Sequence, residues 1–307
     1  MALSKFLDPK NDVAFKKIFG SEKHKDILIH FINDVLELKD NDQIDEVEFL
    51  STIQDAEIAS KKQSIVDVLC RDKNGVQIIV EMQVAPTKGF EKRAQYYAAK
   101  AYSRQLNKGQ EADGLYENLK AVIFIAIADY IVFPDKTEFK SEHVILDKNS
   151  HEHDLQDFSF TFVELPKFKK EKIEELDTTL DKWCYFFKYA AKTSEADMAK
   201  IGSSYKTIGD AYEIVNQYNW NEQQLLAYER ETKRVWDNRS VLEFQLDKAK
   251  AEGMEQGMEQ GMEQGKAERD IEIAKGMILK NYPLADISAL TGLSLAELQD
   301  LKSYFKA

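Results

Sequence analysis

The chain has few cysteines, no long apolar run and no excess of positive charge, and each shortage excludes a class of protein. Its 307 residues include only two cysteines, Cys70 and Cys184, which are too few for a disulfide framework or a cysteine-based zinc site. The longest uncharged apolar run, 121–128, is too short to cross a bilayer. Residues 1–9 reach charge and proline before the apolar core of a signal peptide could form. We therefore expect a cytoplasmic protein with reduced thiols and no membrane segment.

The charge balance restricts the partners of the protein. The 54 acidic side chains outnumber the 42 basic ones, which gives a formal charge of −12. This balance excludes a polycationic surface that coats nucleic acid, so a nucleic-acid role requires a local basic patch. With 43% apolar and 31% charged residues, the composition is that of an ordinary globular protein. At roughly 150 residues per domain, the length predicts about two domains.

The order of the predicted elements indicates an α/β fold. Asp8 and Pro9 predict the cap and first turn of a short helix that ends at Gly20. Apolar periodicity and clusters of β-branched residues then predict a helix, a meander of three strands, a second helix and a further strand. In this order the elements span 22–38, 44–50, 64–70, 76–84, 90–107 and 120–128. Two short strands, 144–146 and 158–163, precede a half of the chain with helical spacing. We therefore predict helices layered against a mixed sheet, with a mostly helical C-terminal annex.

The C-terminal part contains a tandem repeat and a small helical motif. The repeat begins at Gly253 with the sequence Gly-Met-Glu-Gln, and each glycine weakens a helix by about 1 kcal/mol relative to alanine. The repeat is therefore either a charged spacer or a helix through which copies of the chain associate. Residues 287–298 resemble a helix-turn-helix, with a turn at Gly292 and a capping box of Ser294 and Glu297. Acidic residues near the front of its second helix favour a packing or protein-contact module over base reading. The predicted domains are 1–245, the repeat helix or linker 246–270 and the helical tail 271–307.

The acidic residues with the most informative spacing lie in one predicted hairpin. If Gly75 takes the left-handed position of a three-residue turn, counting back along the two strands places Asp67 opposite Glu81. Gln83 then lies on the same face, because side chains alternate along a strand. A two-residue turn would shift the register by one residue and separate the carboxylates.

Asp67 and Glu81, if directly opposed, repel each other unless a cation lies between them. Hard oxygen ligands suit Mg²⁺ or Mn²⁺, which keep several waters and accept phosphate oxygens. Such a cation polarises a phosphate and lowers the pKa of a bound water. The pattern therefore indicates phosphodiester hydrolysis, and the alternative interpretation is an acidic strand edge that discourages aggregation.

The predicted helix after the third strand is basic although the protein is acidic. Between residues 88 and 108, six lysines and arginines face a single acid, Glu91. Such a local excess of positive charge is typical of a surface that binds a phosphate backbone. Arg93 and Tyr97 share one helical face, from which they could contact phosphate or support the metal carboxylates. The alternative is a solvated face with core tyrosines. The predicted nucleic-acid-binding residues are Lys88, Lys92, Arg93, Tyr97, Lys100 and Arg104.

Four segments of the sequence resemble the recombination-promoting nucleases, a family also described as transposases, within the PD-(D/E)XK nuclease superfamily. They are 11–19 (NDVAFKKIF), 66–68 (VDV), 80–83 (VEMQ) and 93–97 (RAQYY). The resemblance covers roughly residues 5–240, and the repeat with its short tail is also similar to what members of the family carry. It implies a restriction-endonuclease-like core and divalent-metal-dependent DNA cleavage linked to recombination.

The resemblance also implies roles for individual residues. Asp67 and Glu81 would hold Mg²⁺ or Mn²⁺, with the main-chain carbonyl of Met82 completing the coordination. Asp12 would be an additional acidic residue of the site. Gln83 departs from the superfamily pattern, in which a lysine holds the attacking water or steadies the transition state. Glutamine orients water but carries no charge. The nearby cations that would supply the missing charge are Lys88, Arg93 and Lys100.

The sequence thus predicts a metal-dependent DNA endonuclease whose partner is DNA rather than a membrane. The predicted catalytic residues are Asp67, Glu81, Gln83 and Asp12. The alternative is a catalytically inactive nucleic-acid-binding or oligomeric interaction protein on the same fold, whose cleavage was lost with the lysine. In either case the C-terminal helices are the predicted surface for homo-oligomerisation.

Overall fold

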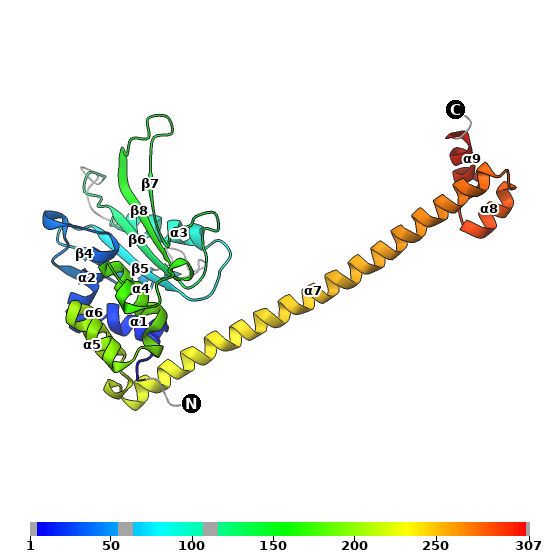
Figure 1. Ribbon diagram of the computed structural model, residues 1–307. Coiled ribbons are helices and arrows are strands. Elements are labelled where there is room, and N and C mark those ends of the chain that lie inside the picture. Colours follow the sequence, from blue (N-terminus) through cyan, green and yellow to red (C-terminus); the bar gives the residue numbers. More distant parts are fainter. Residues whose placement is uncertain (1–4, 55–63, 107–115, 305–307) are drawn as a thin grey trace. The chain divides into compact units, whose positions relative to one another are not determined.

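A mixed sheet organises the N-terminal part of the chain (Figure 1). The computed structural model describes residues 5–54, 64–106 and 116–304, and within these ranges the sheet has six strands. The chain divides into two units, 1–236 and 237–307. The first unit contains the sheet and the helices that cover it.

The strands of the large sheet are β1 (Val47–Phe49), β4 (Val68–Asp72), β5 (Gln77–Gln83), β6 (Val122–Ala128), β7 (Lys140–Ile145) and β8 (Leu155–Glu164). They lie side by side in the order β1-β4-β5-β6-β8-β7. The neighbours β1, β4 and β5 are antiparallel, which confirms the predicted three-stranded meander. Strands β5, β6 and β8 run parallel, and β7 closes the edge antiparallel to β8. Two shorter strands, β2 (Ile53–Gln54) and β3 (Ser64–Ile65), form a separate small sheet.

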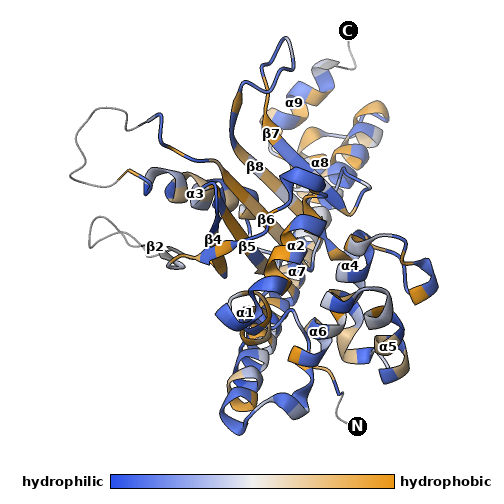
Figure 2. Cartoon of the chain, turned by 90° about the vertical axis from the view of Figure 1, so that its left-hand side faces the viewer, coloured by the Kyte–Doolittle hydropathy of each residue, from blue (hydrophilic) through white to orange (hydrophobic). Residues whose placement is uncertain are grey.

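Helices cover both faces of the large sheet. One face packs against α3 (Phe90–Ser103), which connects β5 to its parallel neighbour β6. The other face packs against α1 (Asp12–Phe19), α2 (Lys25–Val35), α4 (Thr179–Tyr189) and α6 (Lys206–Val215). Hydrophobic colouring is concentrated on β5 and β6 in the interior (Figure 2). The predicted α/β layering with a helical C-terminal region is therefore confirmed, and it is consistent with a restriction-endonuclease-like core.

The first unit also contains a further short helix and six 3-10 turns among its described residues. They are α5 (Glu195–Ser204) and the 3-10 turns η1 (Glu22–His24), η2 (Asp40–Asp42), η3 (Leu165–Lys167), η4 (Ile173–Glu175), η5 (Ala190–Lys192) and η6 (Gln217–Asn219). The long helix α7 (Glu222–Leu279) begins in the first unit. None of the described helices combines the length and the apolar character needed to cross a membrane.

Several predicted helix boundaries differ from the structure, and the helix predicted over 22–38 is a 3-10 turn followed by α2, which ends at Val35. The prediction that Asp8 and Pro9 begin the first helix is wrong, because Asn11 caps α1 by accepting a hydrogen bond from the Val13 N–H at 3.0 Å. The Asp8 carboxylate instead accepts from the N–H of Lys10 at 3.0 Å and so closes a turn. The predicted end of the later helix at 107 lies outside the described residues, and α3 ends at Ser103.

The segment 64–70, which was predicted as one strand, is divided into β3 and β4. The Val66 N–H donates to the carbonyl of Thr52 at 3.3 Å, so this end of the segment continues the pairing of β3 with β2. Strand β4 instead pairs with β1 and β5. Asp67 occupies the bend between the two strands. The division therefore places Asp67 at the end of the large sheet.

The second unit consists of most of α7 with two short helices, α8 (Leu284–Thr291) and α9 (Leu295–Tyr304). The Gly-Met-Glu-Gln repeat is helical within α7, and the side chains from 237 to 269 are exposed. The small core of this unit is formed by Ala274, Ile278, Ile287 and Leu298. The predicted domain boundaries after 245 and 270 both fall inside α7, and they stay predictions.

The turn between α8 and α9 has the predicted chemistry. Gly292 has a left-handed backbone, with φ of +73°. The hydroxyl of Ser294 accepts from the Glu297 N–H at 3.3 Å, and the Glu297 carboxylate accepts from the Ser294 N–H at 2.8 Å. The predicted capping box is therefore confirmed.

Gly75 at the β4–β5 turn is the residue on which the hairpin depends most directly. Its φ is +86°, and a Cβ atom here would lie 3.1 Å from Cγ of Lys120. We expect Gly75→Ala to lower the free energy of unfolding by about 1–2 kcal/mol, the cost of a left-handed backbone for a residue with a side chain. Gly75→Asn should lose less, because asparagine adopts this conformation more readily. Urea denaturation measures both, and equal losses would contradict a backbone origin.

Candidate active site

The hairpin formed by β4 and β5 brings Asp67 and Glu81 together. Its register pairs Val68 with Val80 and Arg71 with Gln77. One further step along the same register places Asp67 opposite Glu81. The register predicted from the turn is therefore confirmed. Both carboxylates lie at the end of the sheet where β4 begins.

Two backbone groups hold the acidic pair in a reciprocal arrangement. The N–H of Asp67 donates to Oε2 of Glu81 at 3.0 Å, and the N–H of Met82 donates to Oδ2 of Asp67 at 2.9 Å. Each carboxylate thus uses one oxygen to bind the opposite strand. The second oxygens, Oδ1 of Asp67 and Oε1 of Glu81, are the ones that meet the neighbouring cations.

A lysine from α1 lies beside Asp67. The Nζ atom of Lys16 is 2.7 Å from Oδ1 of Asp12, one helical turn earlier, and 3.6 Å from Oδ1 of Asp67. Asp12 was predicted to belong to the site, and the structure places it close enough to Asp67 to influence its ionisation. Lys16 was not predicted. The available signal was its spacing, since a residue four positions after Asp12 shares its helical face.

An arginine from α3 lies on the other side, beside Glu81. The Nη2 atom of Arg93 is 3.9 Å from Oε1 of Glu81 and donates to the amide oxygen of Gln83. The Arg93 guanidinium also lies 5.0 Å from the ring centre of Phe90 and 5.9 Å from that of Tyr97. Arg93, one of the three cations named from the sequence, therefore forms an ion pair with the acidic pair.

Gln83 is held at both ends of its amide. Its Nε2 donates to the carbonyl of Ala85 at 2.8 Å and to Oγ1 of Thr87 at 3.1 Å. Its Oε1 accepts from Arg93. Gln83 therefore positions Arg93 in this arrangement, and the predicted water-orienting role stays a prediction.

Burial makes both carboxylates of the pair difficult to ionise. Burial, together with the negative charge of Asp67, raises the pKa of Glu81 to about 8. Burial also raises the pKa of Asp67 to about 6, although the Met82 N–H and Lys16 oppose the shift. The cations present compensate the pair incompletely. The site is therefore one at which an additional positive charge would be bound favourably.

The donor set fits a hard divalent cation that keeps most of its water. Asp67 and Glu81 each offer one carboxylate oxygen whose ion pairs, at 3.6 and 3.9 Å, are long. Carboxylate oxygens suit Mg²⁺ and Mn²⁺, and Mg²⁺ commonly uses one or two protein carboxylates with waters and phosphate oxygens. Within the described residues, no group of three or more histidines, cysteines or acids is gathered in a way that would hold a metal by itself. Two carboxylates with solvent and substrate are therefore the fitting ligand set.

The basic helix α3 leads away from the acidic pair. Arg93, Tyr97, Lys100 and Arg104 follow one another at helical spacing and share one face, next to the buried face that packs on the sheet. Lys88 and Lys92 are exposed at the start of the helix. Nε of Arg93 is buried without a hydrogen-bond partner among the described residues. The helix thus presents positive charge beginning at the acidic pair.

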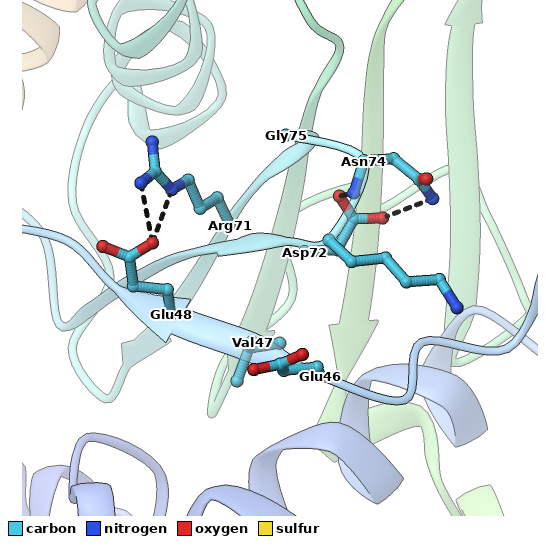
Figure 3. A pocket seen from close by; sticks show the side chains of 8 residues that line it. Glu46, Val47, Glu48, Arg71, Asp72, Asn74 and Gly75 are labelled. Atoms are coloured by element: carbon cyan, nitrogen blue, oxygen red, sulfur yellow. Dashed lines mark hydrogen bonds and ion pairs between the residues drawn. The ribbon is translucent and has the colours of Figure 1, made fainter.

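A separate hollow lies at the opposite end of the hairpin (Figure 3). It is lined by Glu46, Val47, Glu48, Arg71, Asp72, Lys73, Asn74 and Gly75. Arg71 pairs with Glu48 across it at 2.7 Å, and the Asp72 carboxylate caps the turn by accepting from the Asn74 N–H at 2.9 Å. The hollow contains neither Asp67 nor Glu81.

Comparison with known proteins places these residues in a family. The family model described as PD-(D/E)XK nuclease family transposase matches residues 9–245. No curated protein and no solved structure matches the chain. The matched segment includes α1, the β4–β5 hairpin and α3, and so every side chain described around the acidic pair.

The raised pKa of Glu81 predicts how stability depends on pH without metal. The folded-state pKa, about 8, lies above the unfolded value of about 4.3. The contribution of Glu81 to the free energy of unfolding is therefore complete below about pH 4, and it is lost as the pH rises through the folded-state pKa. We expect Glu81→Gln, which retains an acceptor for the Asp67 N–H, to stabilise the protein in EDTA at pH 8 by at least about 1 kcal/mol.

The gain should vanish near pH 4, as measured by chemical denaturation at both pH values. Glu48→Gln is the matched control, because this glutamate is exposed and pairs with Arg71 on the neighbouring strand. The control should show no gain at pH 8. An equal gain for Glu81→Gln at both pH values would instead indicate a packing effect.

Proposed function

We propose, from the premise that the chain belongs to the PD-(D/E)XK nuclease family transposases, that it is a divalent-metal-dependent DNA endonuclease. Family membership implies nuclease activity and DNA binding at the level of the family. The observation that carries the finer proposal is the acidic pair: the buried carboxylate of Glu81 and the partly buried carboxylate of Asp67 face each other across a hairpin, and each keeps one oxygen for a ligand. The link to recombination follows the sequence resemblance.

Asp67 and Glu81 would hold Mg²⁺ or Mn²⁺, which when bound polarises the scissile phosphate and lowers the pKa of a water. In the net reaction the water oxygen forms a bond to phosphorus, and the sugar oxygen leaves with the electron pair of the broken bond. The water loses one proton, the leaving oxygen gains one, and the other proton of the water stays on the new phosphate monoester. The protein's own contribution is to fix the two acids opposite each other through the N–H groups of Asp67 and Met82.

The cations around the pair match an anionic substrate. Arg93, steadied by Gln83, Phe90 and Tyr97, places its guanidinium at the edge of the site. The other basic residues of α3 extend this positive charge along the helix, where successive phosphates of a nucleic-acid backbone would lie. An overall acidic protein with this local basic surface fits DNA that is bound at one place.

Removal of one acid of the pair tests the proposed activity. Asp67→Asn should lower Mg²⁺-dependent nicking of supercoiled plasmid by at least about 100-fold, because metal assistance contributes several kcal/mol to such reactions. Calorimetry should show Mn²⁺ binding to the wild-type chain and none to the variant. Asp45→Asn is the matched control, since this exposed aspartate pairs with Lys73 at 2.7 Å, away from the acidic pair.

Unchanged nicking by Asp67→Asn would contradict the assignment of the site. A wild-type chain that binds DNA but neither binds Mn²⁺ nor nicks the plasmid would instead favour the alternative, an inactive nucleic-acid-binding protein on the same fold.

The role of α3 in DNA binding predicts a specific salt dependence. Lys92→Gln, Lys100→Gln and Arg104→Gln should each weaken the binding of a labelled duplex and lower the slope of log K against log salt by about one. Fluorescence anisotropy at several salt concentrations measures both effects. Lys206→Gln, an exposed lysine of α6 on the other face of the sheet, should leave the slope unchanged, and unchanged slopes for all three α3 variants would contradict a phosphate contact by this helix.

A further inference from the structure

The acidic pair has a second basic neighbour that the proposed function does not yet use. Lys16 of α1 lies beside Asp67, whereas Arg93 of α3 lies beside Glu81. Gln83, at the end of β5, is uncharged and is held by Ala85, Thr87 and Arg93. The positive charge needed at a reacting phosphate must therefore come from a residue on another element.

The backbone of α1 holds Lys16 at a fixed position. Phe15, Ile18 and Phe19 are fully buried in the core on one side of the helix. The side chain of Lys16 projects from the other side and is 40% exposed. Its ammonium is thus reachable from solvent while its Cα is fixed, which is the combination required of a group that meets a large substrate.

The neighbouring cations have other partners. Lys17, the next residue, donates to Oε1 of Gln224 at 2.9 Å and lies 4.0 Å from the ring centre of Trp220. Arg93 is fixed between Gln83 and two aromatic rings. Lys16 forms ion pairs with Asp12 and Asp67, and a divalent cation bound to Asp67 would replace the lysine at that carboxylate.

We propose that Lys16 is a catalytic residue whose ammonium binds the scissile phosphate when Asp67 binds a divalent cation. In this state Asp12 keeps the lysine beside the site, and the ammonium stabilises the negative charge that develops on the phosphate oxygens as water attacks. The inference rests on the proposed function and adds to it the source of the positive charge. It also assigns Asp12 a positioning role through Lys16.

Replacement of Lys16 by cysteine allows its charge to be removed and restored in the full chain. The native cysteines will not interfere, because Cys70 and Cys184 are buried and burial raises the pKa of both thiols, that of Cys70 to about 12. In Lys16→Cys, the new thiolate displaces bromide from 2-bromoethylamine and forms a thioether that ends in an ammonium group at the length of lysine. Iodoacetamide forms a neutral thioether at the same atom.

Lys16→Cys should nick plasmid in Mg²⁺ at least about 100-fold more slowly than wild type, the effect of losing one charge-stabilising donor. Bromoethylamine should restore the rate at least tenfold, whereas iodoacetamide should restore none of it. The matched control is Lys206→Cys, because Lys206 pairs with Asp210 at 2.5 Å with the same four-residue spacing on α6. The control should cleave at the wild-type rate before and after both treatments.

A second readout does not depend on cleavage. With Ca²⁺ in place of Mg²⁺, Lys16→Met should lower the salt slope of duplex binding by about one, because one phosphate contact is lost. In EDTA the slope should not change, since Lys16 is then held by the two aspartates. A slope that changes equally in both conditions, or in neither, would overturn the coupling between Lys16 and metal binding.

The outcomes separate this inference from the proposed function. If Glu81→Gln abolishes cleavage but Lys16→Cys and Lys16→Met cleave within about threefold of wild type, the nuclease stands and the role of Lys16 is wrong. If iodoacetamide restores activity as well as bromoethylamine does, Lys16 acts by packing and not by charge. If the wild-type chain does not cleave in Mg²⁺ or Mn²⁺, the proposed function fails, and the inference fails with it.

Discussion

The pairing of Asp67 with Glu81 across the β4–β5 hairpin is the constraint on which the rest of the site depends. A buried acid and a partly buried acid this close repel each other, and both resist ionisation. The fold tolerates them because each accepts a backbone N–H from the other strand. These hydrogen bonds exist in one register only, and a slip of one residue would turn the two side chains to opposite faces of the sheet. The hairpin turn at Gly75 therefore determines which side chains face each other at the other end of the strands.

The positive charges of the site come from helices rather than from the sheet. Lys16 belongs to α1 and Arg93 to α3, and the two helices approach the acidic pair from different sides. Both contacts with the pair are long, at 3.6 and 3.9 Å, so they compensate the acids without saturating their oxygens. This arrangement keeps the carboxylates available for a further cation, with Lys16 and Arg93 beside them. A closely paired arginine would have satisfied the acids and closed the site.

The parts of the site that depend on local spacing were predictable from the sequence, and the parts that depend on docking were not. The turn residue Gly75 and the alternation of strand side chains sufficed to place Asp67 opposite Glu81. The bend at Asp67 was not predicted, because it arises from the pairing of β3 with β2. The residue pattern of 64–70 alone does not indicate that pairing. Lys16 was missed for a similar reason. Its helical face follows from the sequence, but whether that face meets Asp67 depends on how α1 packs on the sheet.

Gln83 and Arg93 are best understood as one unit. The superfamily pattern has a lysine at the position of Gln83, and a lysine there would remove the acceptor that Arg93 uses. It would also place two cations side by side and leave the contacts to Ala85 and Thr87 to be made by a charged group. A glutamine at this position therefore requires a cation elsewhere, and an arginine at position 93 in turn requires an acceptor at position 83. The uncharged Gln83 at the end of β5 is thus consistent with a site in which helices α1 and α3, rather than the sheet, carry the positive charge.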